Sequence, residues 1–206
     1  MATNTIDQAL KAKFDWSSDK AVSMNFIINA AAIFGLITGT LLGNCFIKHG
    51  RRRALMIFNM LALIATSFTM VVNEPLMVIG RLLFGLCCGV FIYAGQKFIE
   101  ETAPVNMITY TATSSKSFLF GGILICLLLG LGLPRTEDEL KDSEYWRVIF
   151  GFQYICQVMT VILFAACFPE DSISFNIEQG KDTEALTMIK KVYASSENPS
   201  KILSEL

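Results

Sequence analysis

Charged residues and histidine are scarce in this chain. Only 17% of its 206 residues are Asp, Glu, Lys or Arg, and His49 is the one histidine. Hydrophobic residues make up 53% of the sequence and the mean hydropathy is +0.50, which is too apolar for an ordinary soluble domain. No nucleophile has a base beside it at a recognisable spacing. We therefore predict an integral membrane protein that is not an enzyme.

The cysteines show no metal-ligand or redox spacing. All six fall within apolar runs, at Cys45, Cys87, Cys88, Cys126, Cys156 and Cys167. We interpret them as small packing residues and assign no metal and no cofactor. The formal net charge of -1 carries no information about partners, because the basic residues gather in one loop. That loop is a weak indication of nucleic-acid binding, and we predict no nucleic-acid partner.

Residues 1–20 lack the apolar core of a cleavable signal peptide. Their acidic residues, and the absence of arginine, argue against a mitochondrial presequence. Apolar residues recur at helical spacing from Ile6 to Phe14, so this segment fits an amphipathic helix at the membrane interface, with Trp16 as its aromatic anchor. A frayed terminus is the alternative.

Five apolar runs dominate residues 21–168, and each is long enough to cross a bilayer core. They cover approximately residues 21–47, 54–72, 75–98, 111–133 and 148–168. The pattern predicts an all-α fold, a polytopic membrane helix bundle of about five transmembrane helices, with short amphipathic helices at both ends. Residues 169–206 then form a helical tail on the membrane surface, which could cover the bundle or bind a partner.

A short basic loop joins the first two runs within residues 43–55, GNCFIKHGRRRAL. Basic clusters between membrane spans stay on the cytoplasmic side of a bilayer. An odd number of spans places the two chain ends on opposite faces. We expect residue 1 on the outer face and the lysine-bearing tail on the same face as the basic loop.

Small residues in two of the runs are spaced for close contact between helices. Gly35, Gly39 and Gly43 repeat every four residues in the first run, and Gly85 and Gly89 do so in the third. This spacing lets a neighbouring backbone approach. We predict helix packing at these five glycines.

Ionisable residues within spans are costly and therefore informative. Arg81 could form an ion pair or extend its side chain toward the membrane surface. Glu100 and Glu101 lie at the inner end of the third run, where we expect both to reach the surface. Lys116, early in the fourth run, is more simply explained by a side chain reaching back to water than by ligand binding.

Several motifs, in order, resemble the sugar porter (hexose transporter-like) branch of the major facilitator superfamily. GNCFIKHGRRRAL is similar to its loop between the second and third helices, and WRVIFGFQ to the start of its sixth helix. FPEDSISFNIEQGKDTEAL is similar to the segment that follows the sixth helix. GRLLFGLCCGVFIYAGQKFIEETAP resembles its fourth-helix signature, with matches at Arg81, Gly85, Gly89, Glu101 and Pro104.

The resemblance runs from about Val22 to Tyr193 and corresponds to the second to sixth helices of that family. Complete members have twelve helices in two halves, with the substrate at the midplane between them. By this resemblance we expect part of an N-terminal half, with no counterpart to the first helix and none to the second half.

The resemblance also implies a gate motif on the inner face, at Gly43, Ile47, Gly50, Arg51 and Arg52. The family has an acidic residue at the position of Ile47 and arginines at the positions of Ile108 and Ile173. Without these charges, Arg51, Arg52 and Glu101 would lose several partners. We therefore expect the gate motif to be a relic.

The substrate side departs from the family as well. The resemblance places Lys116 where the family has a glutamine that hydrogen-bonds sugar hydroxyls. An ammonium group donates hydrogen bonds but cannot accept them, so a neutral sugar would lose part of its recognition. Gly122, later in the same run, is retained and suits helix packing.

Two functions remain open. The one we favour at this point is a degenerate half-transporter, a non-transporting structural or accessory subunit whose partners are other membrane proteins of a larger complex. The alternative is a transporter of sugar or another small solute that works as a homodimer or with a separate second half, or a truncated sugar transporter. The lipid bilayer surrounds the chain in each case, and either the mitochondrial inner membrane or the plasma membrane could house it.

Overall fold

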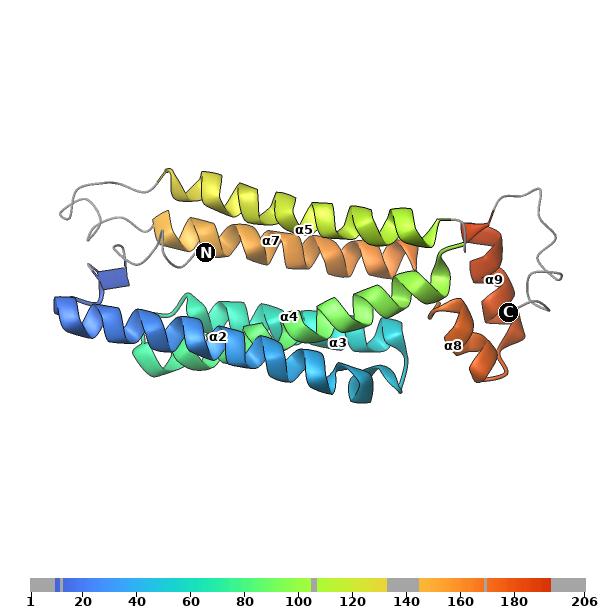
Figure 1. Ribbon diagram of the computed structural model, residues 1–206, viewed down its shortest axis with the longest axis horizontal. Coiled ribbons are helices and arrows are strands. Elements are labelled where there is room, and N and C mark those ends of the chain that lie inside the picture. Colours follow the sequence, from blue (N-terminus) through green and yellow to red (C-terminus); the bar gives the residue numbers. More distant parts are fainter. Residues whose placement is uncertain (1–9, 12, 105–106, 133–144, 169, 194–206) are drawn as a thin grey trace.

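The computed structural model describes residues 10–11, 13–104, 107–132, 145–168 and 170–193. Five long helices run along the molecule and two short ones lie at one end (Figure 1). They are α2 (Ser18–Ile47), α3 (Arg51–Thr69), α4 (Glu74–Thr102), α5 (Ile108–Gly130), α7 (Tyr145–Cys167), α8 (Ile173–Glu178) and α9 (Asp182–Val192). No strand occurs among the described residues, and the predicted all-α membrane helix bundle is confirmed.

Four of the long helices, α2, α4, α5 and α7, are long and apolar enough to cross a membrane, judged by length and composition. The fifth, α3, is 19 residues long and begins with three arginines. The apolar part of α3 is therefore shorter than the run of residues 54–72 that we predicted as a span. It nevertheless packs in the bundle against α4 and α7.

Helix α4 has clear start and stop signals. The side chain of Asn73 accepts a hydrogen bond from the Leu76 amide at 3.3 Å, and a proline lies in the first turn, as is common at helix N-termini. The helix ends at Thr102, shortly before Pro104, because the residue before a proline disfavours helical geometry. Its 29 residues extend over about 43 Å, at 1.5 Å per residue.

In the view of Figure 1 the long helices lie in two groups, α2 with α3 and α4, and α5 with α7. Helix α7 nevertheless packs mainly against α3 of the other group and makes few contacts with α5. Helices α2 and α4 are in backbone contact. A methyl group built on Gly39 would overlap the Leu86 carbonyl, and one built on Gly85 would overlap the Ala32 carbonyl. Gly35 and Gly89 are equally close to the opposite backbone, and Gly43 lies against a tyrosine ring; no larger residue fits these positions without moving a helix.

Gly122, which we expected in a helix contact, does not lie against a neighbouring helix. No heavy atom lies within 4 Å of a methyl group built on it. Among the residues of α5, only Gly130 is buried. The retained glycine therefore makes no close contact in this bundle.

Two hydrophobic clusters hold the bundle together. The inner cluster, at the end that carries the basic loop, includes Ile47, Phe58, Phe98, Ile173 and Ile189. The outer cluster includes Leu10, Trp16, Ile28, Trp146 and Phe150. We use "inner" and "outer" for these two ends throughout. Helices α8 and α9 join the inner cluster and so close that end of the bundle.

The expected role of Trp16 as an interfacial anchor is wrong. Its side chain is only 5% exposed and packs in the outer cluster. Its indole Nε1 donates a hydrogen bond to Glu74 Oε1 at 2.6 Å, and Lys20 Nζ lies 2.7 Å from the same oxygen. The described part of the N-terminal segment is therefore tied to the start of α4. Residues 1–9 lie outside the described residues.

Candidate functional site

The turn between α2 and α3 requires glycine at position 50. Gly50 has a φ of +118°, a conformation that side chains disfavour. A methyl group built on it would also lie 2.6 Å from Asp171 Oδ2. The missing side chain lets the tail approach the turn, although the two segments are far apart in the sequence.

Asp171 caps the N-terminus of α3. Its Oδ1 accepts hydrogen bonds from the backbone amides of Arg51 and Arg52, both at 3.0 Å, and from the Ser172 amide at 2.8 Å. Helix α3 has no capping bond from its own N-cap residue. A carboxylate satisfies the free amides of a helix start and is stabilised there by the helix dipole. The tail therefore completes the first turn of α3.

Arg51 and Glu101 form a partly buried ion pair. Arg51 Nε lies 2.9 Å from Glu101 Oε2, and Nη2 lies 2.9 Å from Oε1. The two side chains are 12% and 14% exposed. Ser172 Oγ donates to Glu101 Oε2 at 2.6 Å, and Arg51 Nη1 lies 3.6 Å from Glu178. We call Arg51, Glu101, Asp171, Ser172 and Glu178 the inner latch.

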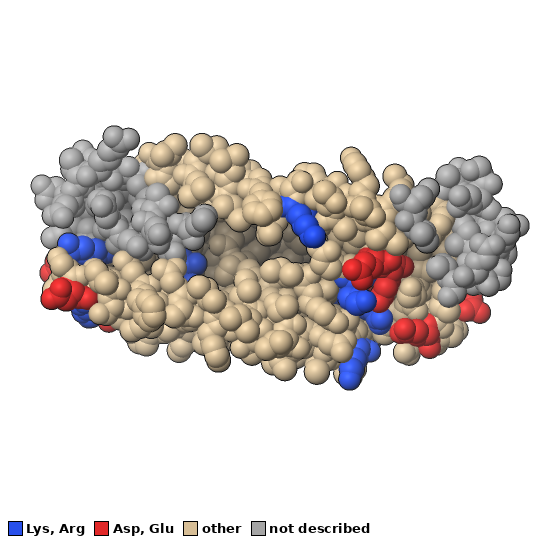
Figure 2. Space-filling view, viewed as in Figure 1, with Lys and Arg blue, Asp and Glu red and all other residues tan. Residues whose placement is uncertain are grey.

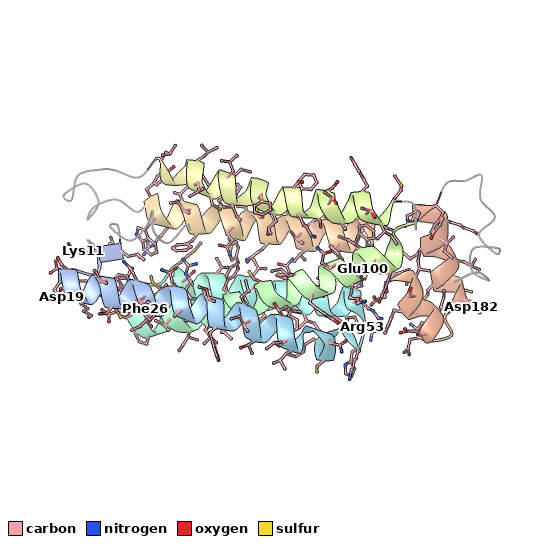
Figure 3. All side chains as sticks on the ribbon, viewed as in Figure 1. Lys11, Asp19, Phe26, Arg53, Glu100 and Asp182 are labelled. Carbon is pink, nitrogen blue, oxygen red and sulfur yellow. The ribbon has the colours of Figure 1, made fainter. Side chains whose placement is uncertain are left out.

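The inner latch joins the start of α3, the end of α4 and the tail. We expected Arg51 and Glu101 to lose several partners, and the two residues are nevertheless paired with each other. The interpretation of the gate motif as a relic stays a prediction. Glu101 also does not reach the surface. Its neighbour Glu100 does so, and it pairs with Lys97 at 3.3 Å; Figure 3 labels Glu100 at the inner end of α4.

Arg52 is the second residue of the basic loop that contacts the segment after α7. Its Nε donates a hydrogen bond to the carbonyl oxygen of Phe168, just beyond the end of α7. Cations suit the carbonyl end of a helix. Arg52 therefore connects α3 to α7, without a carboxylate partner among the described residues.

Apolar contacts accompany the inner latch. Ile47 and Ile173, which the resemblance places at charged positions of the family, are 4% and 1% exposed and share the inner cluster with Phe98. Ile108 begins α5 and is only partly buried. Of these three isoleucines, Ile47 and Ile173 therefore contribute apolar packing at the end of the bundle where the inner latch lies.

Arg81 and Lys116 remain without a carboxylate partner in the described part of the chain. The Arg81 guanidinium lies over the Phe150 ring at 4.6 Å, and its Nε is buried without a hydrogen-bond partner. Arg81 thus makes a cation–π contact where we had left open an ion pair or a side chain extended toward the membrane surface. Lys116 is exposed on α5. Figure 2 shows that the surface is hollowed between the two groups of long helices.

Sequence reasoning missed Asp171 and Ser172. The Ser172 side chain caps α8 by accepting from the Phe175 amide at 3.4 Å, and a serine before a helix is a recognisable signal. No sequence signal links Asp171 to α3, because the two are about 120 residues apart.

Comparisons with known proteins extend over nearly the whole chain. The family model described as "Sugar (and other) transporter" matches residues 2–206. Hexose transporter 1 of Plasmodium knowlesi is 24% identical over 208 residues, which cover 94% of this chain and 41% of that protein. Facilitated glucose transporter protein 1 of Caenorhabditis elegans is 28% identical over 169 residues, covering 80% and 32%.

Solved structures share the fold. The partially occluded, inward-open xylose transporter XylE from E. coli has a TM-score of 0.80 at 19% identity, over 99% of this chain and 52% of that one. The proton:xylose symporter XylE bound to 6-bromo-6-deoxy-D-glucose has a TM-score of 0.78 at 19% identity, over 99% and 48%. The chain spans about two fifths of the length of the hexose transporters it matches.

Proposed function

We propose that this chain, which belongs to the sugar (and other) transporter family, forms one half of a transporter that moves a sugar or another small solute across a membrane. It is an integral membrane protein of the sugar porter branch of the major facilitator superfamily and resembles part of the N-terminal half. The second half would be a second copy of this chain or a separate helical body. The observation that carries the proposal is the assembled inner latch.

A latch of this kind suits an inner end that opens and closes. It joins α3, α4 and the tail through charge-assisted hydrogen bonds, which are strong and directional. Arg51 and Glu101 are partly buried, and Glu178 is 62% exposed, so water can replace the protein partners when the inner end opens. The inner end would then have two discrete arrangements, one with the latch formed and one with its charged groups in water. A conformational switch needs two such states.

Uptake by liposomes tests this proposal directly. The purified chain is reconstituted alone, and uptake of labelled glucose and xylose is compared with that of empty vesicles. We expect flux above empty vesicles, and we expect Glu101→Gln to change its rate while the neighbouring surface change Glu100→Gln leaves it unaltered. An absence of flux for both sugars would overturn transport by a pair of copies.

The second candidate is a non-transporting structural or accessory subunit of a larger membrane complex. Its supporting observation is the apolar burial of Ile47 and Ile173 at positions where the family carries charges, together with Lys116 at the position of the family's sugar-binding glutamine. Such an inner end would favour one conformation.

Purification in mild detergent separates the two candidates. Stoichiometric partner proteins combined with no sugar uptake would support the accessory role. A pair of copies that transports sugar would exclude it. Fractionation of the source cells would show whether the chain resides in the plasma membrane or the mitochondrial inner membrane.

A further inference from the structure

A polar pocket of about 570 Å³ opens beside the inner latch, between the basic loop and the tail. The loop contributes the basic side chains of Lys48, Arg52 and Arg53, and the tail contributes Lys181 and Gln179. Figure 2 shows Lys and Arg side chains next to Asp and Glu at this end of the molecule, and Figure 3 labels Arg53 there. The inner latch contributes Asp171 to the lining of this pocket.

The basic groups of the pocket exceed the acidic groups that could neutralise them. Among the described residues, Lys48 and Arg53 form no ion pair, and both are exposed. Arg52 uses its Nε for the Phe168 carbonyl, and its terminal nitrogens have no carboxylate partner. Three cationic side chains of the lining therefore form no ion pair with a described residue.

Two of the three acidic residues in the pocket are already engaged. Asp171 accepts three backbone amides through Oδ1, and Glu184 pairs with Lys181 at 3.2 Å. Glu170 is the remaining carboxylate on the wall. In formal charge, the four cations of the lining, which include Lys181, exceed its three carboxylates by one. This excess and the unpaired cations of the basic loop favour an anionic ligand.

We propose that this pocket binds a phosphomonoester, carried either by a small soluble molecule or by the headgroup of an inner-leaflet lipid. A phosphomonoester carries close to two negative charges at neutral pH and offers three acceptor oxygens. Arginine matches phosphate oxygens with paired N–H donors, and lysine adds a point charge. The volume lies in the range of pockets for small organic ligands, so the organic part that bears the phosphate can be accommodated beside it.

A bound phosphate would connect the basic loop and the start of α3 to the tail, and the inner latch also joins α3 to the tail. Lys48, Arg52 and Arg53 belong to the α2–α3 junction, whereas Gln179 and Lys181 belong to the tail. The ligand stabilises the closed inner end, because opening would separate these two walls. This inference does not depend on transport, since binding and closure can be measured without flux.

The test uses the full chain in phosphatidylcholine nanodiscs. One arm titrates glucose 6-phosphate, and the other uses nanodiscs that contain phosphatidylinositol 4-phosphate. We expect saturable binding in at least one arm, together with slower amide hydrogen exchange in residues 170–180. The double variant Lys48→Gln/Arg53→Gln should weaken binding by at least about tenfold, because it removes two charge-assisted contacts.

A matched double variant controls for net charge. Lys97→Gln/Lys190→Gln removes two cations outside the pocket and should change binding by less than about threefold. Binding of glucose 6-phosphate alone identifies a soluble ligand, binding of the lipid alone identifies a headgroup, and binding of both identifies recognition of the phosphate itself. No saturable binding in either arm, or an equal loss in the two double variants, overturns the inference.

Discussion

Replacing Glu101 by glutamine should loosen the inner latch without unfolding the bundle. Glutamine keeps the size of the side chain and one oxygen acceptor for Arg51 or Ser172. It removes the negative charge that Arg51 faces at 2.9 Å. The partners that remain for Arg51 are the Phe175 ring, whose centroid is 5.0 Å from the guanidinium carbon, and Glu178, whose side chain is 62% exposed and lies 3.6 Å away. The lost charge is therefore compensated only weakly.

The size of the effect follows from the burial of the pair. Removing one partner of a buried ion pair costs about 3–5 kcal/mol, because the other charge is left unpaired. The retained amide oxygen, and exposures of 12% and 14%, reduce this to about 2–3 kcal/mol. Since about 1.4 kcal/mol is a factor of ten, opening of the inner end should become about 30 to 150 times more populated.

Amide hydrogen exchange in nanodiscs measures this opening, because exchange of protected amides reports local unfolding free energies. Peptides that contain the Arg51 and Arg52 amides, which Asp171 binds, and the first turn of α8 should exchange faster by that factor. Glu100→Gln is the matched control. Its side chain is 49% exposed and pairs with Lys97 on the surface, so exchange should rise by less than about threefold. Equal exchange in the two variants would refute the latch.

Three further changes test the packing and the turn. Gly39→Ala, whose methyl group would overlap the α4 backbone, should destabilise the bundle by about 1–3 kcal/mol. Its control is Gly121→Ala, where the added methyl group has no heavy atom within 4 Å, and this change should be neutral or stabilise the bundle by up to about 1 kcal/mol. Thermal unfolding in mild detergent compares the two variants. Thr66→Val should cost about 1–3 kcal/mol in the same assay, because it leaves the buried amide of Gln157, now 3.2 Å from the Thr66 hydroxyl, without that partner. Gly50→Ala should accelerate exchange in the tail, since the turn needs a positive φ and the space in front of Asp171.

The helices could be predicted from the sequence because each depends on a local pattern. Apolar runs of about 20 residues can satisfy their backbone groups in a membrane only as helices, and four of the five runs became helices that meet the length and composition of a span. The fifth falls short because its first turn carries Arg51, Arg52 and Arg53. Arg51 and Arg52 make their contacts at the inner end, where the tail meets α3.

The pairing of helices was harder to predict. The four-residue spacing of Gly35 and Gly39, and of Gly85 and Gly89, identifies two faces that allow close approach. It does not say that these faces meet each other, rather than two separate neighbours. They do meet, so α2 packs on α4 and not mainly on α3, its neighbour in the chain.

The inner latch could not be derived from the sequence because its partners come from distant segments. The resemblance identifies Ile173 as the position of a family arginine that this chain does not have. The groups that hold the latch are the two residues just before it, Asp171 and Ser172. Trp16 was misplaced for a related reason, since its hydrogen bond to Glu74 spans 58 residues.

Apolar contacts and an ion pair hold the tail against the inner end, and only the ion pair depends on a defined geometry. Ile47 and Ile173 are buried in the inner cluster, and apolar burial stabilises without requiring a particular direction. Replacing ion pairs by such contacts is often neutral or stabilising, because no charge has to lose its water. The pair of Arg51 and Glu101 instead fixes the register of α3, α4 and the tail, since its hydrogen bonds have a defined geometry. Glu101→Gln should therefore let α3, α4 and the tail shift relative to one another, while the buried isoleucines keep the tail packed against the bundle. For that reason we expect exchange in α8 to rise by a limited factor and not to reach the rate of an unprotected chain.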